Sequence, residues 1–166
     1  MLSFKEFLAK YNLKDEATSN VKILNVVQQL DILTKTYMRD DPFTTKSGIV
    51  NLHPTKGTHW VMYTGKFYFD SYGCPPPTNI LNQIKSKYGE CIYSEYKIQK
   101  NDSFCASYCL YVLYLTSLVG FKNAVLNLYY QTYTNSWYKF IIMICTWYKF
   151  IVNKWEKFRI IQFSLK

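Results

Sequence analysis

The chain has 166 residues, enough for one domain with a substantial hydrophobic core. Hydrophobic residues make up 49% of the chain and charged residues 19%, which excludes a wholly disordered protein. The net charge of +9 favours contact with nucleic acid, acidic partners or anionic membrane, without distinguishing among them. Residues 134–166 hold six Lys or Arg and one Glu, so more than half of the excess charge is local.

The cysteine count and the first residues bear on the cellular compartment. Five cysteines are an odd number, which argues against the fully paired disulfide framework of a secreted protein. Residues 1–17 carry charges throughout and contain no apolar signal core. We therefore expect an intracellular, reduced protein in which disulfides are rare.

The first part of the chain reads as two helices followed by a strand. Residues 1–17 contain a short amphipathic helix, and Ser19 lies in a polar triplet that signals a second helix start. Apolar residues then follow at helical spacing, which predicts a helix containing Val21, Leu24, Val27 and Leu30. Residues 49–52 are a predicted strand.

A hairpin, a helix and a strand follow. In residues 59–70, two aromatic-rich apolar runs flank Thr64-Gly65, which predicts a β-hairpin. Three consecutive prolines after it cannot belong to a strand. Thr78 or Asn79 is placed to cap the next helix, and residues 91–98 are a predicted strand.

Residues 104–121 contain no charge over 18 positions, the lower limit for a membrane helix. The alternative is a buried core helix interrupted by Ser, Thr and Gly. We favour the core helix, beginning near Cys105, running to about Leu118 and ended by Gly120. A further helix is expected at residues 121–130.

The hairpin gives the sharpest prediction about chemistry. With a two-residue loop at Thr64-Gly65, His59 lies directly across from Asp70, and cross-strand neighbours have Cβ atoms roughly 4.5–5.5 Å apart. A carboxylate at this distance fixes the tautomer of an imidazole and stabilises its protonated form. The alternative is a surface His–Asp pair at the mouth of a hairpin.

Cys105 supplies a candidate nucleophile at the predicted first turn of the apolar helix. A helix N-terminus favours negative charge, and the thiolate is the reactive form of cysteine. A nearby histidine base would activate the sulfur further. Cys109 lies one turn further along, and we interpret it as a core residue.

Two further choices complete the candidate site. Gln99 precedes Cys105 by six residues, and its amide could donate to the oxyanion of a tetrahedral intermediate; the alternative is a polar surface residue. The chain has two histidines, and we favour His59 over His53 as the base because only His59 has a carboxylate at a defined spacing. The cysteine spacing does not suggest a metal site.

These residues carry a family resemblance. The segments Gly57-Thr58-His59-Trp60-Val61, Tyr68-Phe69-Asp70-Ser71-Tyr72-Gly73 and Gln99-x5-Cys105 resemble the adenovirus-type (adenain-like) cysteine endopeptidases. The order His, Asp, Gln, Cys is also that of the ubiquitin-like-protein proteases. The fuller string from Met38 through residues 48–52 to residues 109–113 looks closest to proteases encoded by Polinton/Maverick-type transposons. The similarity covers about residues 18–130.

The resemblance implies a fold and a reaction. The fold would be α+β, papain-like or adenain-like, with a central Cys-bearing helix packed on a mixed or antiparallel sheet. His59, Asp70 and Cys105 would be the catalytic triad, and Gln99 would help form the oxyanion hole. The organisation would be an N-terminal arm (1–17), a peptidase domain (18–130) and a basic, aromatic tail (131–166) to which no role is assigned.

Substrates and partners are likewise implied by resemblance. The substrate would be a virus-like or transposon structural precursor protein, or alternatively a ubiquitin-like modifier. No cofactor is required, although relatives use DNA or a peptide as activator. We expect a monomer, weak salt-sensitive DNA binding through the basic surface or tail, and a location in the nucleus or a virus-like particle. Membrane contact by the tail is a less favoured alternative.

Two departures keep a further alternative open. These families usually have Gly after the nucleophile, whereas this chain has Ala106, and the hairpin is shorter than usual. An extra methyl group there would crowd the substrate or alter the oxyanion geometry. A catalytically inactive domain that binds nucleic acid or membrane is therefore the second class of function to consider.

Overall fold

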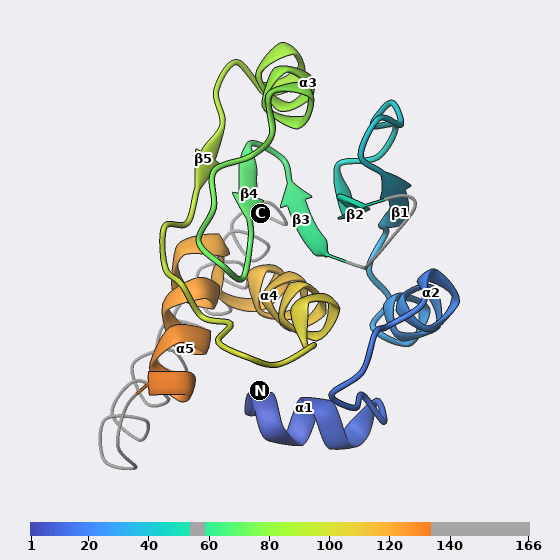
Figure 1. The fold of residues 1–166 in the computed structure, drawn as a ribbon, viewed down its shortest axis with the longest axis vertical. Coiled ribbons are helices and arrows are strands. Elements are labelled where there is room, and N and C mark those ends of the chain that lie inside the picture. The colour runs from blue at the N-terminus through green and yellow to red at the C-terminus, as the bar shows by residue number, and fades with distance from the viewer. Residues whose placement is uncertain (54–58, 134–166) are drawn as a thin grey trace, which may run out of the picture.

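The computed structural model describes residues 1–53 and 59–133. Within these residues the fold is mixed α+β, with five helices and one five-stranded sheet (Figure 1). The helices are α1 (Phe4–Lys10), α2 (Asn20–Gln29), α3 (Thr78–Tyr88), α4 (Cys105–Val119) and α5 (Phe121–Tyr133). The strands are β1 (Lys35–Met38), β2 (Ser47–Asn51), β3 (Trp60–Thr64), β4 (Phe67–Phe69) and β5 (Ile92–Tyr93).

The strands lie side by side in chain order, and the sheet is mixed. β2, β3 and β4 are antiparallel neighbours, whereas β1 pairs with β2 and β5 pairs with β4 in parallel. The predicted hairpin is thus confirmed as β3 and β4. The predicted strand at 91–98 shrinks to two residues, because β4 has only three residues with which β5 can pair and residues 98 and 99 donate their N–H groups to Ser71 instead.

Each face of the sheet is covered by helices. Ile49, Met62 and Phe69 are register partners on the face toward α4, and they share the main hydrophobic core with α1, α2, α4 and α5. Neighbouring positions point to the opposite face, where Val61 and Tyr68 pack against Ile80 of α3. The result is a three-layer arrangement with the sheet between α3 and α4 (Figure 1).

α4 is the central helix of the larger core. Every residue from 105 to 113 is buried, and the helix packs on β3. It begins at Cys105 and ends before Gly120, whose φ of +79° is a conformation that glycine adopts without strain. Among the described residues, no helix combines the length and the apolar character needed to cross a bilayer.

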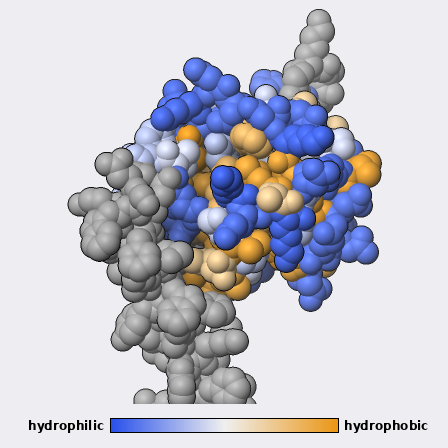
Figure 2. Space-filling view, turned by 90° about the horizontal axis from the view of Figure 1, so that it is seen from below, coloured by the Kyte–Doolittle hydropathy of each residue, from blue (hydrophilic) through white to orange (hydrophobic). Residues whose placement is uncertain are grey.

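The N-terminal elements lie against α4. Ser3 and Glu6 form a reciprocal capping box at the start of α1, and the Phe7 side chain is completely buried in the core. The face of the molecule on which α1 lies shows apolar residues between charged ones (Figure 2). Partly buried Phe4 and Leu8 of α1 pack against the same core.

The buried side chains of α2 differ in part from those that the sequence pattern indicated. Ser19 caps the helix as expected, but only part of the apolar set found at helical spacing is buried: Val27 is in the core, whereas Val21 is 62% exposed, and Ile23 and Val26 are buried as well. The helix carries apolar residues on two adjacent stripes with the same period, so periodicity alone could not select the buried one. The short edge strand β1 was also not predicted, and α3 begins after Pro77 without a side-chain cap.

Candidate active site

His59 and Asp70 meet at the open end of the β3–β4 hairpin. His59 directly precedes β3 and Asp70 directly follows β4, so the antiparallel pairing brings the two together. His59 Nε2 lies 3.0 Å from Asp70 Oδ1. The Asp70 side chain is 3% exposed and that of His59 16%, so the pair is shielded but still reaches solvent at the imidazole.

The register that joins the pair differs from the predicted one. β3 and β4 pair Met62 with Phe69, two residues away from the expected Phe67, because the loop is Gly65-Lys66 rather than Thr64-Gly65. Gly65 takes a φ of +56° at the first loop position, which a β-branched threonine would resist. A shift of two residues keeps side chains on the same face, so Asp70 becomes a diagonal neighbour of His59 and remains within reach.

Tyr72 is a member of the site that the sequence reasoning missed. If continued beyond its end, the observed register would set Tyr72 opposite His59, and the two rings lie 5.0 Å apart at an angle of 37°. The backbone N–H of Tyr72 also donates to Asp70 Oδ1 at 2.8 Å. A turn placed at Gly65-Lys66 in the sequence analysis would have set Tyr72 opposite His59.

Cys105 also bonds to the histidine. Burial disfavours the charged imidazolium of His59, but hydrogen bonds to Asp70 and Cys105 and the negative charge of both partners outweigh it and raise the pKa of His59 to about 9. His59 is therefore protonated at neutral pH. A cysteine bonded to a histidine that a carboxylate orients is the arrangement that activates a nucleophile.

The loop before α4 fixes where Cys105 begins the helix. Asp102 accepts the backbone N–H of Phe104 through Oδ1 at 3.1 Å and the hydroxyl of Tyr108 through Oδ2 at 3.1 Å. Asp15, from the segment after α1, accepts the N–H of Ser103 at 2.5 Å. The helix N-cap is Phe104, and Asp102 satisfies its backbone N–H.

Gln99 is a buried residue with both ends of its amide bonded, not a polar surface residue. Its side chain is 2% exposed, Oε1 accepts the Ser71 hydroxyl at 2.6 Å, and Nε2 donates to the carbonyl of Asp102 at 2.5 Å. The amide is thus tied both to the turn after β4 and to the loop that leads to Cys105.

The residues after Cys105 belong to the core. Ala106 is completely buried and is part of the main hydrophobic cluster, so its methyl group packs inward rather than lining an accessible groove. Cys109 is also completely buried, and its Sγ lies 3.3 Å from the carbonyl of Trp60. Burial raises the pKa of Cys109 well above that of a free thiol. The interpretation of Cys109 as a core residue is confirmed.

The other histidine lies elsewhere in the network. The backbone N–H of His53 donates to Asn51 Oδ1 at 3.0 Å, whereas His59 is the histidine that meets both Asp70 and Cys105. Across residues 1–53 and 59–133 there is no group of three or more His, Cys, Asp or Glu able to hold a metal ion. The basic aromatic tail, with its expected DNA or membrane contacts, lies outside the described residues apart from its first three positions.

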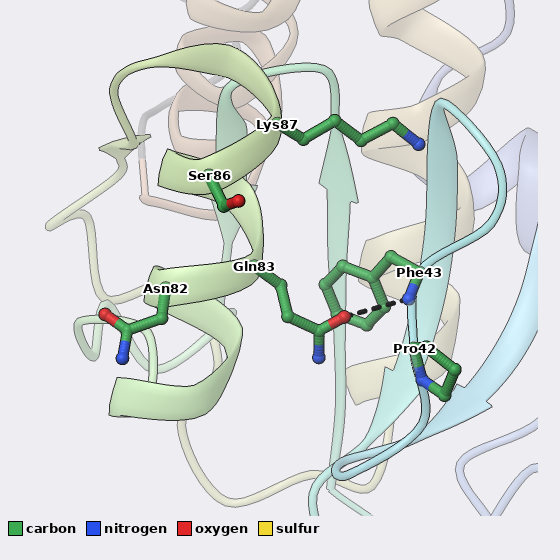
Figure 3. Close-up of a pocket in the computed structure, with 6 residues that line it drawn as sticks. All are labelled: Pro42, Phe43, Asn82, Gln83, Ser86 and Lys87. Carbon is green, nitrogen blue, oxygen red and sulfur yellow. Dashed lines mark hydrogen bonds between the residues drawn. The ribbon is translucent and has the colours of Figure 1, made fainter.

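A separate hollow of about 450 Å³ lies between α3 and the segment after β1 (Figure 3). Gln83 of α3 accepts the Phe43 N–H at 2.8 Å and donates to the Asp41 carbonyl at 3.1 Å. Lys87, one turn further along α3, reaches the Thr45 carbonyl. These side chains tie the loop to α3, and the hollow shares no residue with the His59–Cys105 site.

Comparisons with known proteins add no relative to this picture. No protein-family model, no curated protein and no solved structure matches the chain. Function is therefore inferred from the geometry of the site and from the motif resemblance.

Proposed function

We propose that this chain is a cysteine peptidase with Cys105 as nucleophile, His59 as general acid and base, and Asp70 as the group that orients His59. The observation that carries the proposal is the position of the imidazole, which bonds both to the buried carboxylate of Asp70 and to Cys105. The N-terminus of the central helix adds a favourable field for a thiolate.

The first half of the reaction is acyl transfer to sulfur. The Cys105 thiolate attacks the carbonyl carbon of a peptide bond, and the carbonyl oxygen becomes an oxyanion. One N–H of the Gln99 amide and the backbone N–H of Cys105 donate to that oxyanion. The imidazolium of His59 protonates the leaving amine as the carbon–nitrogen bond breaks, which leaves a thioester on Cys105 and a neutral His59.

The second half restores the enzyme. Neutral His59 accepts a proton from water, and the resulting hydroxide equivalent attacks the thioester carbonyl. The carbon–sulfur bond breaks, the carboxylic acid product leaves and the thiolate–imidazolium pair reforms. Since the pKa of His59 is raised to about 9, the proton donor for the leaving amine is present at neutral pH.

The finer assignment is an adenain-like peptidase with a papain-like arrangement. A central helix that begins at the cysteine, packed on a sheet that holds the histidine and the carboxylate, supports this assignment. By resemblance the substrates are structural precursor proteins of a virus-like element or transposon. Inward packing of Ala106 supports activity, because a buried methyl group does not crowd the substrate.

Alkylation with iodoacetamide tests the nucleophile. We expect labelling of Cys105 at pH 7, located by peptide mass spectrometry, at least about 10-fold faster than labelling of the exposed Cys74, and its loss in Cys105→Ala. Burial and the charge of Asp70 raise the pKa of Cys74, so it makes a matched slow control. The nucleophile assignment is wrong if Cys105 reacts no faster than Cys74.

A small activated ester then separates an active enzyme from an inactive one. p-Nitrophenyl acetate reports acyl transfer without requiring a peptide specificity. We expect a burst of nitrophenol of about one equivalent that disappears in Cys105→Ala. Rapid alkylation of Cys105 without acylation by the ester would instead indicate a protease-like domain that has lost its activity.

A further inference from the structure

Ser71 and Gln99 form a buried polar pair beside the site. Ser71 is 0% exposed and Gln99 2%, and the Ser71 hydroxyl donates to Gln99 Oε1 at 2.6 Å. A buried amide oxygen without a donor would be costly, so this hydroxyl satisfies a group that has little access to water.

The surroundings allow only one orientation of the Gln99 amide. Gln99 Nε2 donates to the carbonyl of Asp102, and a carbonyl can only accept. A flipped amide would place Oε1 against that carbonyl oxygen, with two acceptors facing each other. In the observed orientation the NH₂ group lies toward the loop that leads into Cys105, and its second N–H is the one that we assign to the oxyanion.

The backbone of Ser71 holds the same segment independently of the hydroxyl. Its carbonyl accepts the N–H groups of both Ile98 and Gln99 at 2.8 Å. Removal of the hydroxyl therefore leaves the main-chain attachment of Gln99 in place. Ser71→Ala becomes a selective test of the side-chain bond.

The turn that contains Ser71 cannot easily move. Gly73 closes it with an N–H bond to the Asp70 carbonyl at 2.9 Å and has a φ of +73°. A Cβ atom at Gly73 would lie 2.7 Å from the Glu95 carbonyl oxygen, so only glycine fits this close approach. Two successive residues on this rigid turn, Asp70 and Ser71, thus bond to the base and to the oxyanion donor.

We propose that Ser71 is a positioning residue that holds the Gln99 amide in place to donate to the oxyanion. The inference rests on the proposed peptidase chemistry and adds a role for a residue outside the triad. Without the hydroxyl, Gln99 Oε1 loses its donor and the amide gains freedom to rotate. The effect is expected on the steps that pass through an oxyanion, because the Ser71 hydroxyl acts through the Gln99 amide.

Two reagents separate this role from a structural one. Iodoacetamide reacts with Cys105 by displacement at carbon and forms no oxyanion, whereas p-nitrophenyl acetate acylates Cys105 through a tetrahedral oxyanion. For Ser71→Ala we expect acylation to slow by about 10- to 100-fold and alkylation of Cys105 to change less than about twofold. Ser94→Ala is the matched control and should change neither rate. Ser94 is also a buried serine, and its hydroxyl accepts the backbone N–H of Tyr96.

A double-mutant cycle identifies the route of the effect. Because Ser71 acts through Gln99, Ser71→Ala should slow acylation little further once Gln99→Ala is present. Gln99→Glu provides a second variant of similar shape that accepts the Ser71 hydroxyl but lacks the N–H donors, and it should slow acylation without slowing alkylation to the same degree. Circular dichroism confirms that each variant is folded at the temperature used.

The outcomes are distinguishable. Equal slowing of both reactions by Ser71→Ala, an unchanged acylation rate, or full additivity with Gln99→Ala would each overturn the positioning role. If the wild-type protein shows neither reaction above the level of Cys105→Ala, the peptidase proposal itself has failed. A failure confined to the Ser71 variants leaves the triad assignment intact.

Discussion

The first and second turns of α4 carry the same residue type in two different environments. Cys105 and Cys109 are separated by one helical turn and are 5% and 0% exposed, so burial alone hardly distinguishes them. Cys109 lies against the Trp60 carbonyl, and burial raises its pKa well above the usual range. Cys105 instead lies beside a histidine that Asp70 holds in place.

The difference shows that position relative to the helix start and the hairpin end decides which groups a cysteine of α4 meets. The helix N-terminus and the imidazolium act on the first turn, and both fields weaken within one turn. Cys109 receives neither and faces a carbonyl oxygen, which disfavours a negative sulfur. Removing the charge next to Cys105 tests whether the two cysteines differ for this reason. Stability measurements on variants of the site then show what the surrounding groups contribute.

The largest effect is expected when the carboxylate is neutralised. Asp70→Asn keeps an oxygen for the Tyr72 N–H but removes the charge that stabilises the imidazolium of His59. Acylation by p-nitrophenyl acetate should fall by about 10²- to 10⁴-fold, and alkylation of Cys105 should approach the slow rate of Cys74. Asp41→Asn is the matched control, since Asp41 also accepts a backbone N–H but lies outside the site. An effect of similar size in both variants would contradict the comparison.

A smaller effect is expected on stability as a function of pH. The folded-state pKa of His59 is about 9, above the unfolded value of about 6.5, so charged His59 stabilises the fold. The stabilisation is fully present below pH 6.5 and is lost as the pH rises through about 9, with a magnitude on the order of 3 kcal/mol. His59→Gln should therefore cost most stability in urea unfolding at pH 6 and least at pH 10. His53→Gln is the matched variant, and a cost of His59→Gln that grows with pH would contradict this prediction.

The smallest effect is expected for Cys109, in the second turn of α4. Cys109→Ala removes a buried sulfur and its contact with the Trp60 carbonyl, and should cost about 1–2 kcal/mol in the free energy of unfolding. Alkylation of Cys105 at pH 7 should be unchanged, because Cys109 makes no contribution to the charge at the site. Slower alkylation in this variant, with the fold intact by circular dichroism, would show that the two turns are not independent.

Much of the local structure could be predicted from particular residues. Ser19 marked the start of α2, Gly120 marked the end of α4, and the two apolar runs on either side of Thr64-Gly65 predicted the hairpin. The pairing of His59 with Asp70 was also predicted, but through the wrong register. It survived because a shift of two residues preserves the face on which a side chain lies.

Other features depended on contacts that no local pattern encodes. The buried stripe of α2 was decided by packing against the core, and the bonds from Ser71 to Gln99 join positions 28 residues apart. Asp15 reaches across 88 residues to the loop before Cys105. Sequence spacing carries no information about such pairs until the chain path is known.

Local sequence patterns were enough to predict that a helix begins at Cys105, that a hairpin joins His59 to Asp70, and that Cys109 is buried. These follow from short-range rules: capping, turn chemistry and periodicity. Only the tertiary structure decided that the helix start and the hairpin end meet, that Tyr72 lies on His59 and that Ser71 holds Gln99. Those contacts depend on how α4 packs on β3, and packing is a property of the whole core rather than of any one segment.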